Sequence, residues 1–394
     1  MRVLFTSPVF PPDLGGPAVY VPSLGRYLVE RGHEVKVIAF CSEANPAGHP
    51  FEVITIPRGF MPLRYLKAFI EVWRQAPTAD VVYVQEHLAL LHVLAARLRR
   101  VPVVIRIMVD GSWEIAHRKG WCGDDDIVTF QSRSYGWRVR LTRALQRVWW
   151  GWCTHIISCS EFLRQILIES HGVEPDKVQR IFNAYHGPDP DTVTETLAEA
   201  RAALGLDPSR RIVLTICRLM IWKGVDGILK ALAELPEDVE LLVAGDGDME
   251  EAWKALAEDL DLGERVHFLG NVPHHRIPLL IRAADVFVLN SRYEGLSHTL
   301  LEVLQFETPM VVSRACGNPE VVEDGVNGLL VDPADHLELA GAVRKLLEDK
   351  GLGCVLAARG QARRALFSRE GTFAQVLEVL EEAAAGSGAE SPVR

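Results

Sequence analysis

The chain has 394 residues, of which 48% are hydrophobic and 24% charged, a composition typical of a globular protein with about two domains. Its net charge of −10 argues against general nucleic-acid binding, and no apolar stretch reaches the roughly 20 residues of a membrane span. The seven cysteines show no metal-binding spacing and the N-terminus lacks a cleavage site, so we expect a cytoplasmic protein without disulfides.

Charge is divided unevenly along the chain. Residues 1–185 hold 22 Lys and Arg against 17 Asp and Glu, whereas residues 186–394 hold 20 against 35. This division indicates two domains with different partners, although drift of surface charge without function explains it as well.

The first half alternates between short apolar, β-branched runs and segments with helical periodicity, such as 18–31 and 88–100. The runs, which we predict to be strands, are 3–7, 34–40, 52–56, 81–85, 103–108, 156–160 and 178–182. Alternation of this kind predicts a parallel sheet covered by helices on both faces.

Two features of the first half are candidates for binding. Gly15 and Gly16 follow the first strand, where backbone N–H groups can approach an anion, although a plain turn fits equally well. Five arginines are interleaved with aromatic residues between Arg133 and Trp152, and no acid occurs from Gln131 to Cys153. Three interpretations of this stretch stay open: a helix that packs its tryptophans in the first domain, a peripheral contact with an anionic membrane, and a groove for a phosphorylated acceptor.

A turn-rich segment with a following Ala/Glu helix, between 183 and 211, marks the predicted domain junction. Beyond it, apolar runs at 212–217, 240–244, 266–269, 286–290, 310–313 and 328–331 again alternate with helical stretches, for example 224–235 and 298–306. The fold class is therefore α/β, with two Rossmann-like, doubly wound domains. Such sheets bind ligands in the loops after their strands.

Two of these loops carry charged residues. Arg218 and Lys223 follow the strand at 212–217 and could clamp a diphosphate, or could be ordinary surface cations. Glu294 and Glu302 flank the start of the helix after the strand at 286–290. Carboxylates accept hydrogen bonds from vicinal hydroxyls, so these two acids are candidates to hold a sugar and a ribose; the alternative is a helix-capping acid and a solvated helix residue.

The pair Arg218 and Lys223, followed by Glu294-x7-Glu302, resembles the retaining, nucleotide-sugar-dependent glycosyltransferases of family 4, bacterial type, which have the GT-B fold. Supporting similarities are Gly15-Gly16, Ala244-Gly245-Asp246-Gly247, Ala283-Ala284-Asp285-Val286 and the segment from Asn318 to Gly325. The resemblance implies two Rossmann-like domains that face a central cleft. It implies residues 1–185 on the acceptor side, residues 186–367 for the nucleotide sugar, a helix at about 368–385 that returns to the first domain, and a flexible tail at 386–394.

The resemblance also implies roles for matched positions. Arg218 and Lys223 would bind the donor diphosphate, Glu294 the hydroxyls of the transferred sugar, and Glu302 the ribose. The remaining donor-binding positions that it implies are Gly15, Gly16, Gly270, Asn271, Val272, Gly295, Leu296, Ser297, His298 and Thr299. Many relatives have a histidine where this chain has Asp110, so Asp110 is either a catalytic carboxylate or a turn residue.

The resemblance thus predicts an enzyme of glycan or glycoconjugate biosynthesis that transfers a sugar from a nucleoside diphosphate to an acceptor hydroxyl with retention. UDP-sugars are favoured and GDP-sugars are the second choice; no metal or other cofactor is expected. The acceptor is a glycan, a lipid-linked molecule or a small molecule. An epimerase or hydrolase on the same fold, and a non-catalytic sugar-nucleotide-binding subunit, are the alternatives.

Overall fold

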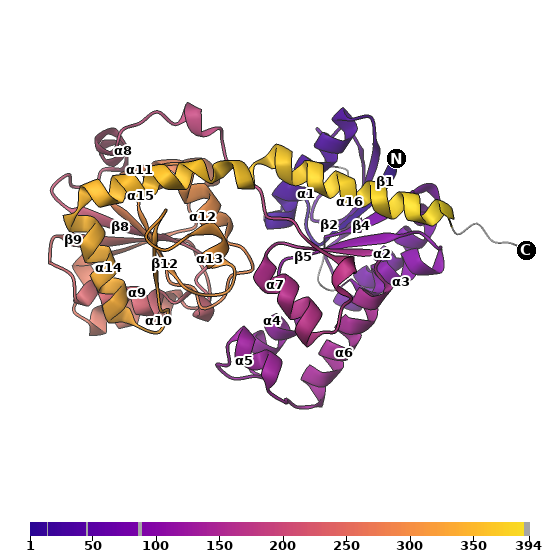
Figure 1. The fold of residues 1–394 in the computed structure, drawn as a ribbon, viewed down its shortest axis with the longest axis horizontal. Helices are drawn as coiled ribbons and strands as arrows, with labels where there is room; N and C mark the ends of the chain where they lie inside the picture. Colours follow the sequence, from indigo (N-terminus) through magenta and orange to yellow (C-terminus); the bar gives the residue numbers. More distant parts are fainter. Residues whose placement is uncertain (14, 45, 86–88, 390–394) are drawn as a thin grey trace, which may run out of the picture. The chain divides into compact units, whose positions relative to one another are not determined.

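The computed structural model describes residues 1–394 except 14, 45, 86–88 and 390–394. The chain folds into two compact units, one formed by residues 1–182 and 369–394 and the other by residues 183–368 (Figure 1). The sequence placed the junctions at 185/186 and 367/368. Each unit is built on its own parallel sheet, so the predicted α/β class with two Rossmann-like domains is confirmed.

The sheet of the first unit has the strand order β3-β2-β1-β4-β5-β6-β7, and all its strand pairs are parallel. Its strands are β1 (Arg2–Ser7), β2 (Glu34–Cys41), β3 (Glu52–Pro57), β4 (Val81–Val84), β5 (Val103–Ile107), β6 (His155–Ser158) and β7 (Val178–Arg180). Each corresponds to one predicted run. Their near-continuous apolar character reflects burial on both faces.

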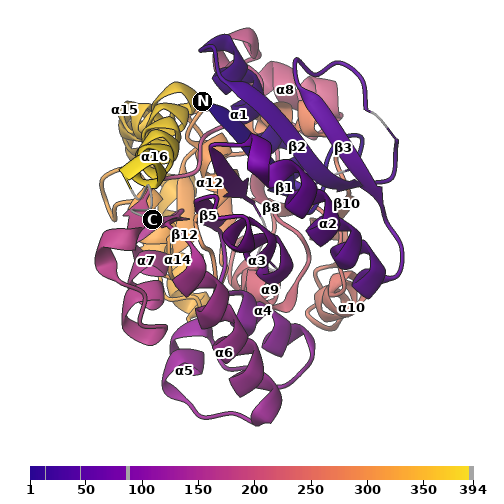
Figure 2. The same ribbon diagram turned by 90° about the vertical axis from the view of Figure 1, so that its right-hand side faces the viewer.

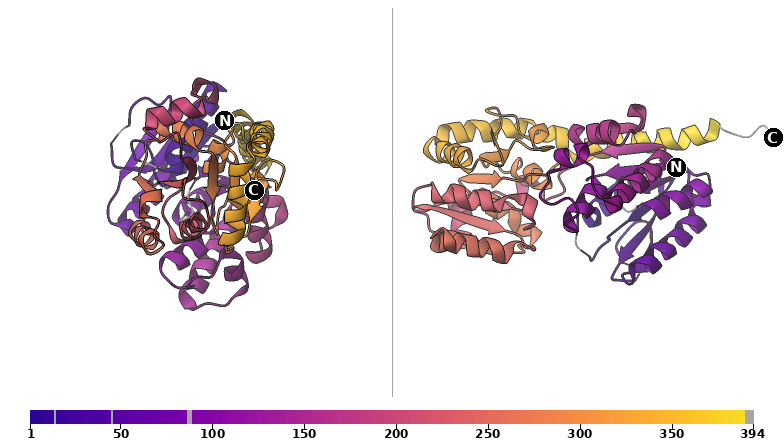
Figure 3. Two further views of the ribbon diagram at one scale, coloured as in Figure 1. Left: turned by 90° about the vertical axis from the view of Figure 1, so that its left-hand side faces the viewer. Right: turned by 90° about the horizontal axis from the view of Figure 1, so that it is seen from below.

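Helices cover both faces of this sheet (Figures 2 and 3). They are α1 (Gly16–Glu30), α2 (Met61–Gln75), α3 (Leu90–Leu98), α4 (Gly111–Arg118), α5 (Ile127–Ser132), α6 (Trp137–Trp152), α7 (Glu161–Gln165) and α16 (Arg369–Ala389). Helix α2 contacts β2 and β3, α3 contacts β4 and β5, and α6 packs on α3. Throughout the described part of the chain, each helix is too short or too polar to cross a membrane.

Helix α16 comes from the far end of the chain and completes the core of the first unit. Phe373, Val376 and Leu380 are fully buried there among residues of α1 and the strands. The helix continues to Ala389, so residues 386–389, predicted to belong to a flexible tail, are helical. The remaining tail positions, 390–394, lie outside the described residues.

The sheet of the second unit has the strand order β10-β9-β8-β11-β12-β13, again parallel. Its strands are β8 (Arg211–Ile216), β9 (Val239–Ala244), β10 (Val266–Gly270), β11 (Val286–Leu289), β12 (Met310–Ser313) and β13 (Leu329–Val331). Its helices are α8 (Leu197–Leu204), α9 (Val225–Ala233), α10 (Glu250–Asp259), α11 (Ile277–Ala283), α12 (His298–Val303), α13 (Asn318–Val321), α14 (His336–Glu348) and α15 (Lys350–Ala362). The right panel of Figure 3 shows this sheet between two helical layers.

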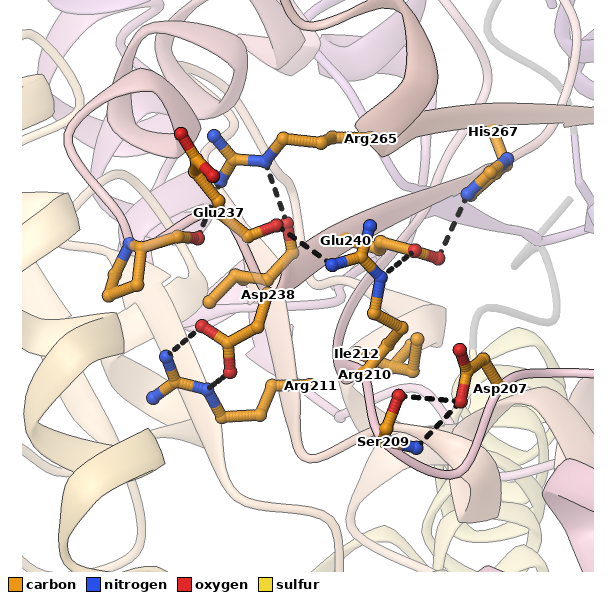
Figure 4. Close-up of polar contacts among 12 residues, drawn as sticks. Asp207, Ser209, Arg210, Arg211, Ile212, Glu237, Asp238, Glu240, Arg265 and His267 are labelled. Atoms are coloured by element: carbon orange, nitrogen blue, oxygen red, sulfur yellow. Dashed lines mark hydrogen bonds and ion pairs between the residues drawn. The ribbon is translucent and has the colours of Figure 1, made fainter.

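Ion pairs secure the amino ends of β8 and β9 (Figure 4). Arg211 donates two hydrogen bonds to the carboxylate of Asp238, both 2.6 Å long. Arg210 Nε lies 2.7 Å from Glu240 Oε1, and His267 Nε2 lies 3.0 Å from the other oxygen of Glu240. These contacts hold the edge of the sheet opposite to the strand ends where ligands bind, which leaves the loops at those ends free for a site.

Candidate functional site

Loops after neighbouring strands meet at the carboxyl edge of the second sheet. The strands β9, β8, β11 and β12 are adjacent in that order, so the loops that follow them are brought side by side. Ser313 Oγ at the end of β12 donates a hydrogen bond of 2.6 Å to the carbonyl of Ser291, and Leu219 N donates one of 2.7 Å to the carbonyl of Asp246. The loops that carry the predicted site residues of this unit therefore form one connected surface.

The loop after β8 presents two cations in different settings. Arg218 is exposed, and its guanidinium has no hydrogen-bond or ion-pair partner among the described residues. Lys223 ends a short 3-10 turn, Ile221–Lys223, and its side chain is 17% exposed. One cation thus faces solvent, and the other is held within the connected loops that follow β8, β9, β11 and β12, which we call the loop cluster.

Lys223 pairs with Glu294, which follows β11. Its Nζ lies 2.6 Å from Glu294 Oε1, and Ser291 Oγ donates a hydrogen bond of 2.8 Å to the same oxygen. The Glu294 side chain is 11% exposed. An ion pair shielded from water is stronger than a surface pair, and each partner fixes the position of the other.

The two loops are also joined through their backbones. Arg292 N donates a hydrogen bond of 2.7 Å to the carbonyl of Trp222, and Asn290 Nδ2 donates one of 3.2 Å to the carbonyl of Gly224. Gly224 has φ 65°, and a Cβ there would lie 2.2 Å from the carbonyl oxygen of Asn290. Only glycine permits this approach, which sets the distance between Lys223 and Glu294.

The loop after β12 supports the acidic loop from its other side. Gly317 N donates a hydrogen bond of 3.0 Å to the carbonyl of Glu294. A Cβ on Gly317 would lie 2.1 Å from the carbonyl oxygen of Gly295. The backbone around Glu294 is therefore fixed by contacts with the loops after both β8 and β12.

The segment after Glu294 begins a short helix. Gly295, Leu296 and Ser297 are buried, His298 is exposed and Thr299 is half-buried. Ser297 caps α12, and its side chain accepts a hydrogen bond of 3.4 Å from Leu300 N. The helix ends at Val303 rather than at the predicted Phe306, since residues 304–307 form turns.

Glu302 lies within α12 and is largely buried, with 18% of its side chain exposed. Burial raises the pKa of Glu302 from 4.5 to about 7, because the charged form loses its hydration. His274 faces it, with Nδ1 3.7 Å from Glu302 Oε1. This distance is too long for a hydrogen bond. The Glu302 carboxylate is therefore available to accept hydrogen bonds from a ligand.

The predicted contacts to the base lie at the end of β10. Gly270 ends that strand, with Asn271 exposed and Val272 half-buried after it. The carbonyl of Gly270 accepts a hydrogen bond of 2.8 Å from Gly245 N, at the end of β9. This contact places the three residues at the same edge of the sheet as the loop cluster.

The other predicted site residues belong to the first unit. Gly15 and Gly16 are exposed, and α1 begins at Gly16 with Gly15 as its N-cap. Asp110 follows β5 and is fully buried. These residues lie at the carboxyl edge of the first sheet, a different sheet from the one that carries the loop cluster.

Asp110 is surrounded by hydrogen-bond donors. Its Oδ1 accepts from Ser112 N, Ser112 Oγ and Gln146 Nε2 at 3.0, 2.7 and 2.9 Å. Its Oδ2 accepts from Gln131 Nε2 at 2.7 Å and lies 2.9 Å from His171 Nε2. Burial acts to raise the pKa of Asp110, but the hydrogen bonds, first of all that of His171, hold it well below its usual range.

This network favours the second of our two interpretations of Asp110. Asp110 is the N-cap of α4 and connects that helix to α5, α6 and the turn that ends at His171. Its oxygens are already occupied, and no part of its side chain is exposed. We therefore assign it to the positioning of these helices rather than to substrate contact.

The assignment predicts that Asp110→Asn destabilises the protein. The amide would point an N–H group at donors, and a buried unsatisfied polar group costs about 1–3 kcal/mol, which corresponds to a fall in Tm of roughly 2–12 °C. Thermal unfolding followed by fluorescence measures this directly. An unchanged Tm with a large loss of kcat would instead support a catalytic carboxylate.

Two site residues were not singled out from the sequence. Ser291 donates to Glu294, and Asn290 bridges to Gly224. Neither belongs to a distinctive motif; their position directly after a buried strand was the available signal. Of the three consecutive acidic residues at 124–126, Asp126 caps α5 and Asp125 pairs with Arg133 at 2.7 Å.

Comparison with protein families gives two matches that together span most of the chain. A model described as glycosyl transferases group 1 matches residues 198–363, and a model described as glycosyl transferase 4-like domain matches residues 15–184. Each match falls almost entirely within one of the two structural units.

Individual relatives agree with these matches. An uncharacterised glycosyltransferase of Methanocaldococcus jannaschii is 24% identical over 89% of this chain and 90% of its own length. A D-inositol 3-phosphate glycosyltransferase of a Mycobacterium species is 34% identical, but the match spans 55% of this chain and 48% of that relative. HepE of Anabaena, solved with UDP, superimposes with a TM-score of 0.77 at 22% identity, over 97% of this chain and all of that one. This last likeness shows the same fold.

Proposed function

Since the chain belongs to the family 4-type glycosyltransferases with the GT-B fold, we propose that it transfers a sugar from a nucleoside diphosphate sugar to an acceptor hydroxyl with retention of anomeric configuration. UDP is the proposed nucleotide and GDP the second choice. HepE of Anabaena, which has the same fold, has been solved with UDP-glucose as well as with UDP, and this supports the choice of UDP.

The observation that carries the proposal is the ion pair between Lys223 and Glu294. It joins the loops after two adjacent strands, at the edge of the sheet where doubly wound folds bind nucleotides. A cation for a diphosphate and a carboxylate for sugar hydroxyls therefore lie in contact, as a donor that contains both groups requires. Arg218, exposed in the same loop, supplies a second, unpaired cation.

In the proposed reaction, the bond between the sugar and the diphosphate breaks first and leaves an oxocarbenium-like centre. Arg218 and Lys223 stabilise the negative charge that develops on the departing diphosphate. The acceptor hydroxyl attacks the same face of the sugar, and a donor phosphate oxygen removes its proton. Glu294 holds the hydroxyls of the transferred sugar, and its contact with Lys223 couples the sugar and diphosphate positions.

The remaining contacts fix the nucleoside. We assign Glu302 to the ribose hydroxyls, the backbone of Gly270, Asn271 and Val272 to the base, and the backbone from Gly295 to Thr299 to the distal phosphate and sugar. Gly15 and Gly16, at the start of α1 of the first unit, are assigned to the donor as well.

A panel of UDP- and GDP-sugars tests the proposal. Thermal shift reports which nucleotide binds, and release of nucleoside diphosphate with and without candidate acceptor alcohols reports turnover. We expect UDP-sugars to raise the Tm and release of UDP to depend on an acceptor. Two outcomes would contradict a transferase: release of free sugar at a rate that no acceptor increases, and formation of an epimeric nucleotide sugar.

The raised pKa of Glu302 gives a prediction for Glu302→Gln. Folding raises this pKa from 4.5 to about 7, so the folded state favours the protonated form, and the stability that this form provides is lost as the pH rises through 7. The neutral amide avoids that loss. The variant should match the wild type at pH 4, below the unfolded-state pKa, and be more stable by about 3 kcal/mol at pH 8.

The same variant should bind nucleotide more weakly. Hydrogen bonds to a charged group contribute about 1.5–3 kcal/mol, so we expect the Kd for UDP at pH 8 to rise by roughly ten- to a hundredfold. Denaturant unfolding at the two pH values and calorimetric titration with UDP measure both effects. Equal stability of variant and wild type at pH 8 would show that Glu302 is not buried as described, and an unchanged Kd would remove it from the ribose site.

Activity should persist in the presence of EDTA. In the proposed site, Arg218 and Lys223 meet the charge of the diphosphate, so no divalent cation is needed for that purpose. Initial rates with and without chelator measure this. Loss of activity in EDTA, with recovery on addition of Mg²⁺ or Mn²⁺, would contradict the proposal that Arg218 and Lys223 alone neutralise the diphosphate.

A further inference from the structure

Helix α6 of the first unit turns an apolar face toward solvent. Trp137, Leu141, Leu145 and Val148, which we call the α6 strip, are between 37% and 64% exposed. Their spacing of four, four and three residues places them on one side of the helix. The opposite side carries the buried Val139 and Trp150, so core packing, one of the three interpretations left open by the sequence, accounts for that side and not for the strip.

Arginines flank the α6 strip. Arg140 and Arg147 are exposed on one side of it, and Arg138 lies on the other. With Arg133 and Arg143, Arg140 and Arg147 line a hollow of about 650 Å³ between α5, α6 and the residues at 169–170. The guanidinium of Arg140 has no hydrogen-bond or ion-pair partner within the described residues. Glu169 also lines the hollow, which stays basic with four arginines to one acid.

The neighbouring helices also combine exposed apolar residues with arginines. Helix α2 contacts α3, and α3 contacts α6, as can be followed in Figure 2, where all three lie toward the viewer. The guanidinium of Arg99 lies 4.9 Å from the ring centre of Trp73 on α2, and that of Arg97 lies 5.7 Å from the ring centre of Trp152 on α6. Exposed apolar residues of this part of the surface are Phe60, Met61, Leu63, Leu66, Ile70 and Leu98.

The charge balance of these helices is opposite to that of the whole chain. Residues 60–75, 90–100 and 137–152 contain ten Lys and Arg and a single acid, Glu71. Glu71 is paired with Arg74 at 3.1 Å. In a chain of net charge −10, a surface that combines exposed tryptophan and leucine with almost exclusively positive charge is complementary to a bilayer that carries anionic headgroups.

We propose that α6, together with α2 and the end of α3, is a docking surface for an anionic lipid bilayer. The α6 strip enters the boundary between headgroups and acyl chains, and the arginines beside it contact lipid phosphates, for which the arginine-lined hollow has room. Binding of this kind is peripheral and decreases with salt. The proposal concerns helices of the first unit, whereas the loop cluster belongs to the second unit, so its test does not depend on the sugar-transfer reaction.

Cosedimentation with vesicles tests the proposal on the full-length protein. Vesicles of phosphatidylcholine with phosphatidylglycerol should sediment the protein at low salt, and vesicles of phosphatidylcholine alone should not. Binding should decrease as the salt concentration rises. Failure of the anionic vesicles to sediment the wild-type protein at low salt overturns the proposal.

Two sets of variants separate the contributions of charge and apolar contact. Replacement of Arg138, Arg140 and Arg147 by Gln should weaken vesicle binding about a hundredfold, at about 1 kcal/mol for each cation. The double variant Leu141→Gln and Leu145→Gln should weaken it about tenfold or more, because each leucine loses burial among the lipids. All five positions are exposed, so the Tm should stay close to that of the wild type.

A matched control removes three exposed cations of the second unit, Lys230, Lys345 and Arg359, by substitution with Gln. It changes net charge equally and should leave vesicle binding unchanged. An equal loss in this control would show that net charge alone matters, and the proposal would fail. Two other results would also overturn it: complete competition by soluble glycerol phosphate, which assigns the hollow to a free phosphorylated acceptor, or a concentration-dependent dimer abolished by the leucine variants, which assigns the strip to a second copy of the chain.

Discussion

Glu294→Ala is expected to lower kcat by about a hundred- to a thousandfold, the range found when one strong transition-state contact is removed. In the proposed reaction, Glu294 contacts the sugar as positive charge develops on it, so the loss should fall mainly on kcat and less on KM. Steady-state kinetics with a UDP-sugar identified by the donor panel provide the measurement.

The ion pair makes a second variant necessary. Alanine at 294 leaves the Lys223 ammonium, 17% exposed, without its carboxylate, so part of the effect could come from a disturbed loop. Glu294→Gln keeps the size and an oxygen that can accept from Ser291 and Lys223, so its Tm should fall less than that of Glu294→Ala, while it should also lose most of its activity. Glu258→Ala, at an exposed site on α10, serves as the control and should be fully active. A Glu294→Gln enzyme with most of its kcat would remove this residue from the catalytic assignment.

Lys223→Ala and Arg218→Ala are expected to weaken UDP binding by roughly ten- to a hundredfold each, because each loses a charge-assisted contact worth about 1.5–3 kcal/mol. Their effects on stability should differ. Arg218 is exposed, whereas loss of Lys223 leaves the Glu294 carboxylate, 11% exposed, with Ser291 as its one remaining partner in the described part of the chain. We therefore expect a lower Tm for Lys223→Ala and an unchanged Tm for Arg218→Ala.

Calorimetric titration with UDP, together with thermal unfolding, tests both statements. Lys230→Ala, on the exposed side of α9 in the same unit, is the matched control for loss of one cation. If the Kd for UDP is unchanged in both variants, neither residue binds the diphosphate. Arg218 would then be an ordinary surface cation, and Lys223 a cation that stabilises the loops.

The fold was predictable from the sequence because parallel strands that are buried on both faces consist of continuous apolar runs. The runs at 34–40 and 240–244, for example, became β2 and β9 with ends shifted by one residue. Helix ends were less predictable where tertiary contacts decide them. Helix α12 stops at Val303, three residues before the end we predicted, and α16 continues to Ala389.

The site was predictable only in part. The motif spacing placed Lys223 and Glu294 at one sheet edge, but it did not indicate that they form an ion pair. That contact depends on how Gly224 and Asn290 bring the two loops together. The two interpretations of Asp110 could not be separated from the sequence. Beside the neighbouring Ser112, its partners are residues 131, 146 and 171, and sequence reasoning cannot anticipate the three distant ones without the packed structure.

The return of α16 to the first unit has a consequence for the order in which the protein folds during synthesis. Domains usually fold in the order in which they leave the ribosome. Here residues 183–368 can fold as soon as they emerge, whereas the unit that is synthesised first lacks Phe373, Val376 and Leu380 of its core until α16 has been translated. The apolar face of the N-terminal unit therefore stays uncovered until α16 has followed the whole second unit out of the ribosome.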